Sequence, residues 1–247
     1  MLSADVALIG GTGIGNRLRS WGGTPFLVPT RYGPMRGRLL QWEGITIATI
    51  ARHSIGHTNP PHRVNYRAIA LGCKALGVRA ALSSAAVGSL RPDWNTGTLA
   101  ICGDSIDVSG RNITMYENEI CHTDVTRIFP MHDCISHAAS ELGLDVKNHA
   151  CYVCANGPRF ETPAEIKMMR DFGGDVVGMT ASSEAVAFRE ADVKYGCLAV
   201  VSNLAAGLAP THLVHGEVAE AMHEFGGTVV NLMLATARRI AGAHAFA

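Results

Sequence analysis

The most constraining feature of this sequence is the alternation of short apolar runs with longer segments of helical periodicity, which continues along the chain. Such alternation predicts an α/β fold, in which helices cover the faces of a buried sheet. We find no internal repeat, low-complexity tract or linker, so residues 1–247 are expected to form a single domain with a mixed, twisted central sheet flanked by helices. Strands are predicted at 6–9, 39–42, 45–50, 80–82, 99–102, 150–155, 175–178 and 197–202.

Several segments carry the periodicity and the end signals of helices. Gly77 is expected to close the first of them. In "TPAE" at 162–165, Thr162 caps a helix, Pro163 takes its first turn and Glu165 completes a capping box. Glu161 therefore lies on a loop just outside a helix, where functional residues are common. Helices are predicted at 65–76, 133–142, 163–172, 183–192 and 216–240.

The balance of charge argues against two classes of partner. Lys+Arg and Asp+Glu both number 21, without runs of like charge, so neither nucleic acid nor a membrane surface is expected. We recognise no signal peptide and no apolar stretch long enough to cross a membrane. The seven cysteines are scattered, which predicts reduced thiols in a cytoplasmic protein. Cys151 and Cys154 have a C-x-x-C spacing, but residues three apart in a strand face opposite sides.

The first predicted strand runs into a glycine-rich turn, "VALIGGTGIG" at 6–15. A dinucleotide fingerprint, G-x-G-x-x-G, fails here because Asn16 stands where the third glycine belongs, and residues 25–42 hold no acidic side chain for a ribose. No Gly-Lys-Ser/Thr follows either. The backbone N–H groups of the turn can still cradle a small anion, with the Thr12 hydroxyl as a further donor. A plain tight turn is the alternative.

A second unusual stretch, "IARHSIGHTNPPHRVNYRA" at 50–68, begins at the end of a predicted strand. The guanidinium of Arg52 offers a planar fork of donors that matches phosphate, and His53 follows it directly. We therefore expect an oxyanion clamp. Solvated loop charges remain an alternative. A metal site is a weaker one, because His53 and His57 are four apart but no further ligand set lies near.

Six ordered segments together resemble the trimeric purine nucleoside phosphorylase family, in its methylthioadenosine/methylthioinosine phosphorylase branch. The resemblance covers nearly the whole chain and implies the nucleoside phosphorylase fold. The segments are "IGGTG" (9–13), "ARHSIGHTNPPHRVNYRA" (51–68), "SSAAVGSLRPDWNTG" (83–97), "GPRFETPAE" (157–165), "DVVGMTASSEA" (175–185) and "VVSNLAAG" (200–207).

The resemblance implies a phosphate site. Thr12 and Thr180 match two hydroxyl donors of the family, and Arg52 and His53 match its phosphate-binding pair. The remaining contact falls at Ala85, where one branch has threonine, so only the backbone N–H serves here.

The resemblance also implies a nucleoside site beside the phosphate. Phe160 matches the aromatic residue that stacks on the base, and Met179 the residue under the ribose. His122 resembles a residue that reaches the neighbouring subunit's site, which implies a homotrimer. His215 resembles the histidine that meets a 5′-hydroxyl in ordinary purine nucleoside phosphorylases. Ala86 and Ala205 complete the expected nucleoside contacts, and residues 211–222 are expected to wall the 5′ group.

Two polar residues bear on which base is read. An ionised carboxylate only accepts hydrogen bonds, so Glu161 favours the N1–H of a 6-oxopurine over the bare N1 of adenine. Asn203 and Ala205 stand where the adenine-specific branch has aspartates. Two mispaired buried groups would cost about 1–3 kcal/mol each, or roughly a hundredfold in selectivity.

The resulting hypothesis is reversible phosphorolysis of S-methyl-5′-thioinosine, with Arg52, His53 and Asn203 as the catalytic residues. Phosphate is a co-substrate, and no cofactor or metal is expected. The alternatives are a methylthioadenosine phosphorylase, an inosine/guanosine phosphorylase, a nucleosidase that uses water, and a non-catalytic nucleoside-binding protein. The failed glycine spacing argues against a dinucleotide-binding oxidoreductase.

Overall fold

The computed structural model describes residues 2–54, 56, 58–209 and 215–242, with the backbone alone of His215. Within them, one mixed sheet of nine strands has the order β2-β3-β4-β1-β5-β8-β7-β6-β9, with a further pairing of β5 to β9. The strands are β1 (Val6–Gly10), β2 (Thr24–Val28), β3 (Met35–Trp42), β4 (Ile45–Ala51), β5 (Ala80–Ser89), β6 (Leu99–Asp107), β7 (Val146–Cys154), β8 (Val176–Gly178) and β9 (Lys194–Leu204).

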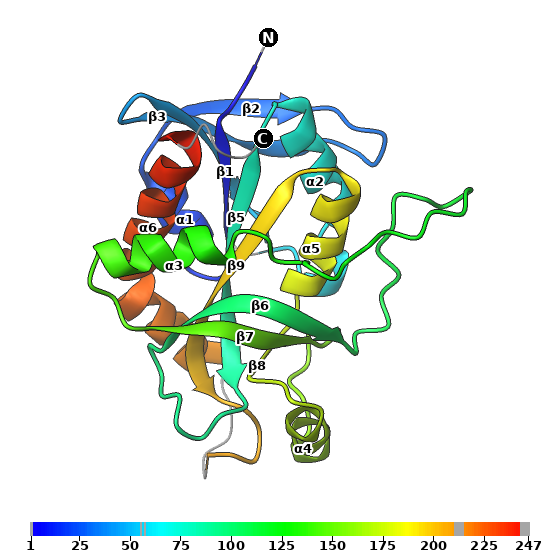
Figure 1. Cartoon of the computed structure of the whole chain (residues 1–247), viewed down its shortest axis with the longest axis vertical. Coiled ribbons are helices and arrows are strands. Elements are labelled where there is room, and N and C mark those ends of the chain that lie inside the picture. The colour runs from blue at the N-terminus through cyan, green and yellow to red at the C-terminus, as the bar shows by residue number, and fades with distance from the viewer. Residues whose placement is uncertain (1, 55, 57, 210–214, 243–247) are drawn as a thin grey trace.

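Four strands in the middle of the sheet are parallel neighbours. β4 pairs with β1, β1 with β5, and β5 with β9, each in parallel register. The carboxyl ends of these strands therefore meet at one edge of the sheet, and β5 and β9 run side by side down the molecule in Figure 1. Because β5 pairs with both β8 and β9, strands β5, β8, β7, β6 and β9 also close into a ring.

Two groups of helices cover the sheet (Figure 1). On one face α1, α3 and α6 share a core with β1, β5, β6 and β9. On the other face α2 and α5 pack against the same central strands and against each other. The helices are α1 (Ile14–Ser20), α2 (Tyr66–Ala75), α3 (His132–Glu141), α4 (Pro163–Asp171), α5 (Ala181–Glu190) and α6 (His215–Gly242), with a 3-10 turn at Pro61–Arg63.

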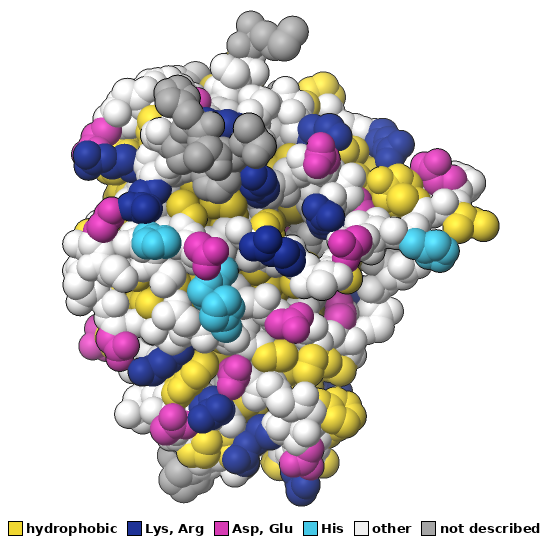
Figure 2. Space-filling model, in the orientation of Figure 1, with side chains coloured by type: hydrophobic (Ala, Val, Ile, Leu, Met, Phe, Trp, Pro, Cys, Tyr) yellow, Lys and Arg dark blue, Asp and Glu magenta, His cyan; other side chains and the backbone are white. Residues whose placement is uncertain are grey.

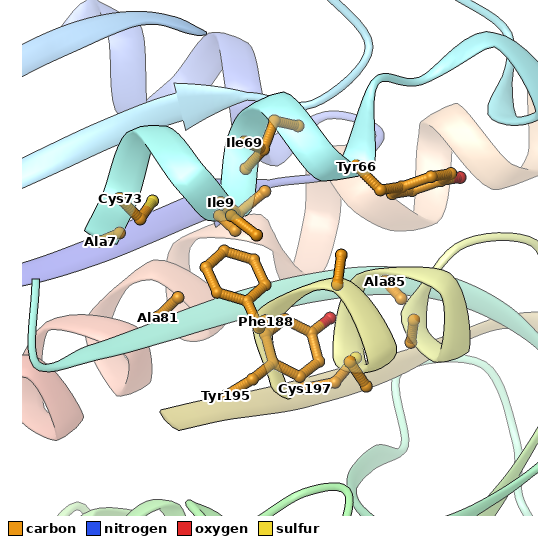
Figure 3. Packing of buried hydrophobic residues seen from close by; sticks show 14 of the residues in the cluster. Ala7, Ile9, Tyr66, Ile69, Cys73, Ala81, Ala85, Phe188, Tyr195 and Cys197 are labelled. Carbon is orange, nitrogen blue, oxygen red and sulfur yellow. The ribbon is translucent and has the colours of Figure 1, made fainter. Parts of the chain in front are cut away.

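Figure 3 shows how the second face is filled. Phe188 of α5 stacks on Tyr195 of β9, with ring centroids 5.2 Å apart. Cys73 of α2 lies beside Ala7 of β1, and Ala81 of β5 is a further small residue of this core. Such small residues let the helices approach the sheet closely.

The predicted α/β fold, with a mixed sheet flanked by helices, is confirmed. The capping box of α4 is present, with the Thr162 hydroxyl accepting from the Glu165 N–H and the Glu165 carboxylate accepting from the Thr162 N–H. Gly77 has φ 72° just after α2, as a helix-closing glycine requires.

Two elements were not predicted from the sequence, and several strands are longer than predicted, β5 by the largest margin. α1 begins without a side-chain cap and contains Gly15 and Asn16, so its helical signal is weak. β2 begins Thr24-Pro25, and proline is tolerated there because β2 lies at the edge of the sheet. β5 continues past residue 82 through small polar residues to Ser89, because β9 pairs with it along its full length.

The surface agrees with the balanced composition. On the face shown in Figure 2, basic and acidic side chains are interspersed, without a large patch of one sign. Among the described residues, no helix combines the length and hydropathy needed to cross a bilayer.

Candidate active site

A cavity of about 330 Å³ lies where the parallel strands end. Ligands in open α/β sheets bind outside the carboxyl ends of strands, where loops from neighbouring strands converge. The cavity brings together most of the residues predicted from the sequence, although they come from six separate stretches of chain. Those lining it are Thr12, Arg52, His53, Ala86, Phe160, Glu161, Met179, Thr180, Asn203 and Ala205.

Arg52 is a buried cation that β4 delivers to the cavity. Its side chain is 2 % exposed and its Nη1 donates to Oε2 of Glu184 at 3.0 Å. Its Nη2 donates to the carbonyl oxygen of Ser84 at 2.9 Å. Burial opposes the charge, but Glu184 outweighs it, so the pKa of Arg52 is raised above its ordinary value. A guanidinium has five donors, so N–H groups remain for an anion in the cavity.

The glycine turn after β1 leaves space for the guanidinium of Arg52. A Cβ at Gly11 would collide with the guanidinium of Arg52 and with the Ser84 carbonyl oxygen. The Gly11 N–H donates to the Ser84 hydroxyl at 3.2 Å. The close packing of turn, guanidinium and β5 therefore requires glycine, and it places Thr12 on the wall of the cavity.

His53 is buried and held on both sides of its ring. Its Nδ1 lies 2.9 Å from the carbonyl oxygen of Asn59, which fixes the proton on Nδ1. Its Nε2 accepts a longer bond, 3.4 Å, from Nε of Arg52. The imidazole must therefore rotate or gain a proton before it donates to a phosphate.

Thr180 lies at the N-terminus of α5. It is 4 % exposed, and its hydroxyl makes no capping bond. Its backbone N–H donates to the Tyr152 hydroxyl at 3.1 Å. The N-terminus of a helix attracts anions through its free N–H groups and its dipole. Thr180, Thr12 and Arg52 thus give the cavity lining a donor-rich part.

A further part of the cavity lining comes from the segment between β7 and α4. Phe160 is 36 % exposed and Glu161 is half-buried. Burial raises the pKa of the Glu161 carboxyl above its ordinary value. Arg159 does not pair with Glu161; both of its terminal nitrogens bind Glu165 instead. Glu161 is thus left facing the cavity as an acceptor.

Asn203 is fixed at the end of β9. Its Oδ1 accepts from the Ser202 hydroxyl at 2.8 Å, and its Nδ2 donates to the Leu204 carbonyl oxygen at 2.9 Å. These two bonds set the orientation of the amide, because a flipped amide would place two carbonyl oxygens against each other. The second N–H of Nδ2 is available for a ring nitrogen or oxygen of a base.

Of the other predicted residues, two do not line this cavity and the third has no described side chain. Ala85 is in β5, and its methyl group packs in the core shown in Figure 3, so only its backbone could serve as predicted. His122 is exposed in the segment between β6 and α3 and does not line this cavity. His215 begins α6, but its side chain lies outside the described residues, as does His57.

Several residues that hold the site in place were not predicted from the sequence. Glu184 accepts a hydrogen bond from Arg52, and the Tyr195 hydroxyl donates to Glu184 at 2.6 Å. An acidic residue among small neighbours in "TASSEA" is the one signal that could have found this pair. Val218 of α6, within the predicted 211–222 wall, also lines the cavity. Arg111 bonds to two residues that line it, Pro61 and Met179.

Among the described residues, no group of three or more His, Cys, Asp or Glu side chains could hold a metal ion. The seven cysteines are free thiols. Cys154 is buried and Cys151 half-buried, in line with opposite faces of the predicted strand.

The chain matches the family model described as "Phosphorylase superfamily" over residues 5–238. A protein of Dictyoglomus turgidum named "Probable 6-oxopurine nucleoside phosphorylase" is 39% identical over 223 residues, which cover 88% of this chain and 84% of that protein. A "Probable S-methyl-5'-thioinosine phosphorylase" of Methanopyrus kandleri is 37% identical over 233 residues, covering 93% and 90%.

Solved structures share the fold. The methylthioadenosine phosphorylase from Schistosoma mansoni in complex with adenine has a TM-score of 0.90 at 25% identity, covering 98% of this chain and 93% of that one. A methylthioadenosine phosphorylase from an antarctic soil metagenomic library has a TM-score of 0.87 at 28% identity, covering 98% and 88%.

Proposed function

Because this chain belongs to the phosphorylase superfamily, we propose that it cleaves the N-glycosidic bond of S-methyl-5′-thioinosine with phosphate, giving hypoxanthine and 5-methylthioribose 1-phosphate. The observation that carries the proposal is one cavity whose lining combines two kinds of group. Buried Arg52 and Thr180 supply donors for an anion, and Glu161 supplies a carboxylate; we assign the donors to a phosphate end and the carboxylate to a base end.

Phosphate occupies the donor-rich end. Arg52 supplies charge and N–H donors, Thr12 and Thr180 supply hydroxyl groups, and the N-terminus of α5 adds its dipole. His53 joins them once it is protonated or rotated. The backbone N–H of Ala85 is the remaining proposed contact. Since most of these groups are already fixed by the fold, little reorganisation is needed when the anion binds.

The reaction is a displacement at C1′ of the ribose. A phosphate oxygen forms a bond to C1′ while the bond from C1′ to N9 breaks, and the bonding electron pair leaves with the purine. The sugar becomes cationic between these events, so the phosphate held below it acts as nucleophile and counter-charge. Asn203 donates through Nδ2 to N7, where negative charge accumulates, and the purine anion then takes a proton from solvent. Positioning and electrostatics supply the catalysis.

Glu161 selects the base in this proposal. Its ionised carboxylate accepts the N1–H of hypoxanthine, while Phe160 and Met179 lie against the base and the ribose. Adenine would place the lone pair of N1 against the same carboxylate. Ala205, which has no polar group, offers nothing to a 6-amino group.

The 5′ group distinguishes two candidate substrates. Pro60, Pro61 and Val218 give the cavity apolar walls, which suit a methylthio group, and the Methanopyrus kandleri relative carries that name. A broader 6-oxopurine nucleoside phosphorylase is the second candidate, favoured by the name of the 39% identical relative. A 5′-hydroxyl would need a polar partner, which we assign to His215 in that case.

The proposal also covers the co-substrate, the assembly and the cellular location of the enzyme. The reaction needs phosphate as co-substrate and neither metal nor cofactor. We propose a homotrimer in which exposed His122 reaches the neighbouring cavity. We place the enzyme in the cytoplasm, since seven free thiols suit a reducing compartment.

A substrate panel tests the proposal. Methylthioinosine, methylthioadenosine, inosine and adenosine are each supplied with and without phosphate, and the release of base is measured. We expect phosphate-dependent cleavage with methylthioinosine preferred. Preference for the two amino-purines would reject the role of Glu161, and equal cleavage without phosphate would identify a nucleosidase.

A further inference from the structure

Arg111 lies in the segment 108–131, which joins β6 to α3 without helix or strand. Its guanidinium is half-buried beneath the cavity and makes five hydrogen bonds to groups from four other stretches of chain. Nη1 donates to the Pro61 carbonyl oxygen at 3.2 Å and to the Tyr66 hydroxyl at 3.0 Å. Nη2 donates to the carbonyl oxygens of Met179 at 2.6 Å and Ala155 at 3.0 Å, and contacts Sγ of Cys154 at 3.6 Å.

The bond from Arg111 to the Met179 carbonyl oxygen fixes the backbone beside two residues that we propose contact the substrate. Met179 and Thr180 are consecutive residues that face the ribose and the phosphate. Arg111 holds the carbonyl oxygen of the peptide between them, and the Tyr152 hydroxyl holds its N–H at 3.1 Å. The peptide plane is therefore fixed from both sides, and with it the direction of both side chains.

The bonds of Arg111 to Pro61 and Ala155 hold two further segments near the cavity. Pro61 lines the wall that follows Arg52 and His53. Ala155 begins the segment that leads to Phe160 and Glu161. Arg111 thus bonds to two residues that line the cavity, Met179 and Pro61, and to the start of the segment that carries Phe160 and Glu161, although it does not itself line the cavity.

We propose that Arg111 is a positioning residue that sets the spacing between the phosphate and nucleoside subsites; this inference rests on the proposed function. A lysine cannot replace it, since one ammonium group cannot reach carbonyl oxygens of three segments in a planar fork. Loss of Arg111 is expected to loosen Met179 and Thr180 without removing any group that touches substrate.

One detail of the guanidinium makes the proposal testable by chemical rescue. Its Nε is buried and makes no hydrogen bond within the described part of the chain, so all the bonds come from Nη1 and Nη2. A free guanidinium ion can make every one of them. It should therefore occupy the space left in an Arg111→Ala variant and restore the geometry.

The experiment compares Arg111→Ala and Arg111→Lys with a matched control, Arg67→Ala. Like Arg111, Arg67 is half-buried and lies over a tyrosine ring, that of Tyr32 at 4.3 Å. It also donates to a carbonyl oxygen of the segment 108–131, that of Thr114. Unlike Arg111, it makes none of its hydrogen bonds within the described residues to a residue that lines the cavity. Initial rates are measured against phosphate and methylthioinosine, with and without about 50 mM guanidinium, far below the molar concentrations that unfold proteins. Sodium chloride at equal ionic strength is the salt control.

We expect both Arg111 variants to lose about 10²-fold in kcat/KM for each substrate, the loss typical of misplaced binding groups. Guanidinium should recover about tenfold in Arg111→Ala, and less in Arg111→Lys because the lysine stem fills the space. Arg67→Ala should stay within about threefold of the wild type with no response to guanidinium. Full activity of folded Arg111→Ala, or a loss that guanidinium does not recover, would overturn the proposal.

Phosphate binding separates this outcome from failure of the proposed function. The rise in Tm on adding phosphate reports binding without turnover. It should be present in the wild type, reduced in Arg111→Ala and restored by guanidinium, even if no nucleoside is cleaved. If wild-type turnover is present but this pattern is absent, the proposed function survives and the role of Arg111 does not.

Discussion

The two ends of the cavity are built in different ways. At the phosphate end, Arg52 and Thr180 are each 4 % exposed and are held by residues distant in sequence, such as Ser84 and Glu184. At the base end, Phe160 is 36 % exposed and the segment is held locally, by the capping box of α4 and by Arg159.

This difference explains how one fold can serve different bases. The phosphate end cannot change without disturbing β4, β5 and α5 together, because its bonds cross the sheet. The base end can change through one or two residues, since the side-chain bonds nearest to Phe160 and Glu161 come from Arg159 and from the capping box. In the proposed function, the chemistry common to all substrates is thus placed on the buried strand ends, and discrimination on the exposed segment.

The largest effect is expected from Arg52→Lys. Lysine keeps a positive charge beside Glu184, so the buried carboxylate is not left alone, but it loses the planar fork. We expect kcat/KM for phosphate to fall about 10³-fold, corresponding to ~4 kcal/mol of lost transition-state stabilisation. Steady-state kinetics with phosphate varied would measure it. A loss below tenfold would mean that the phosphate end is not organised around this cation.

Asn203→Ala should have the next largest effect. The N–H that meets N7 acts mainly in the transition state, so kcat should fall about 10²-fold with little change in KM. Single-turnover measurements isolate the chemical step. Ser202→Ala, which removes the hydroxyl that orients the amide, should give a smaller loss in the same direction. Unchanged turnover in Asn203→Ala removes this residue from the mechanism.

Glu161→Gln tests the base end alone. A glutamine amide can both donate and accept, so the preference for 6-oxopurines over 6-aminopurines should drop about 10- to 100-fold while the KM for phosphate is unchanged. Glu165→Gln is the matched control, because it lies in the same region and can still form a capping box. Equal shifts in both variants would show that α4, not the carboxylate, sets the preference.

The smallest effect concerns pH. Burial raises the pKa of Glu161, so its carboxyl gains a proton at a pH above the ordinary value of ~4.3 as the solution is acidified. The protonated carboxyl can donate to N1 of adenine and no longer favours N1–H. The ratio of kcat/KM for methylthioinosine over methylthioadenosine should therefore fall a few-fold between about pH 7.5 and about pH 5. Glutamine does not titrate, so the ratio in Glu161→Gln should stay constant; a parallel decline there would assign the effect to another group.

The pattern of apolar runs sufficed to predict most strands and helices, because burial imposes its periodicity on every element that faces a core. α1 and β2 were missed because one lacks a cap and the other is a half-exposed edge strand. Arg52 was found because a guanidinium followed by a histidine at a strand end suits an oxyanion, whereas Asn203 and the role of Glu161 came from the resemblance to the family. Arg111 gave no signal, since its partners are mostly backbone carbonyl oxygens, which no side-chain pattern records.

By itself the sequence determined the α/β class, the helix start at Thr162 and the identity of the polar groups, since these depend on local propensity and residue chemistry. Only the tertiary structure decided that the turn at Gly11 makes room for Arg52, that Glu184 balances that cation, and that Arg111 bonds to two residues of the cavity lining. These facts depend on which distant segments meet where β1, β4, β5 and β9 end, and that meeting is set by packing across the whole sheet.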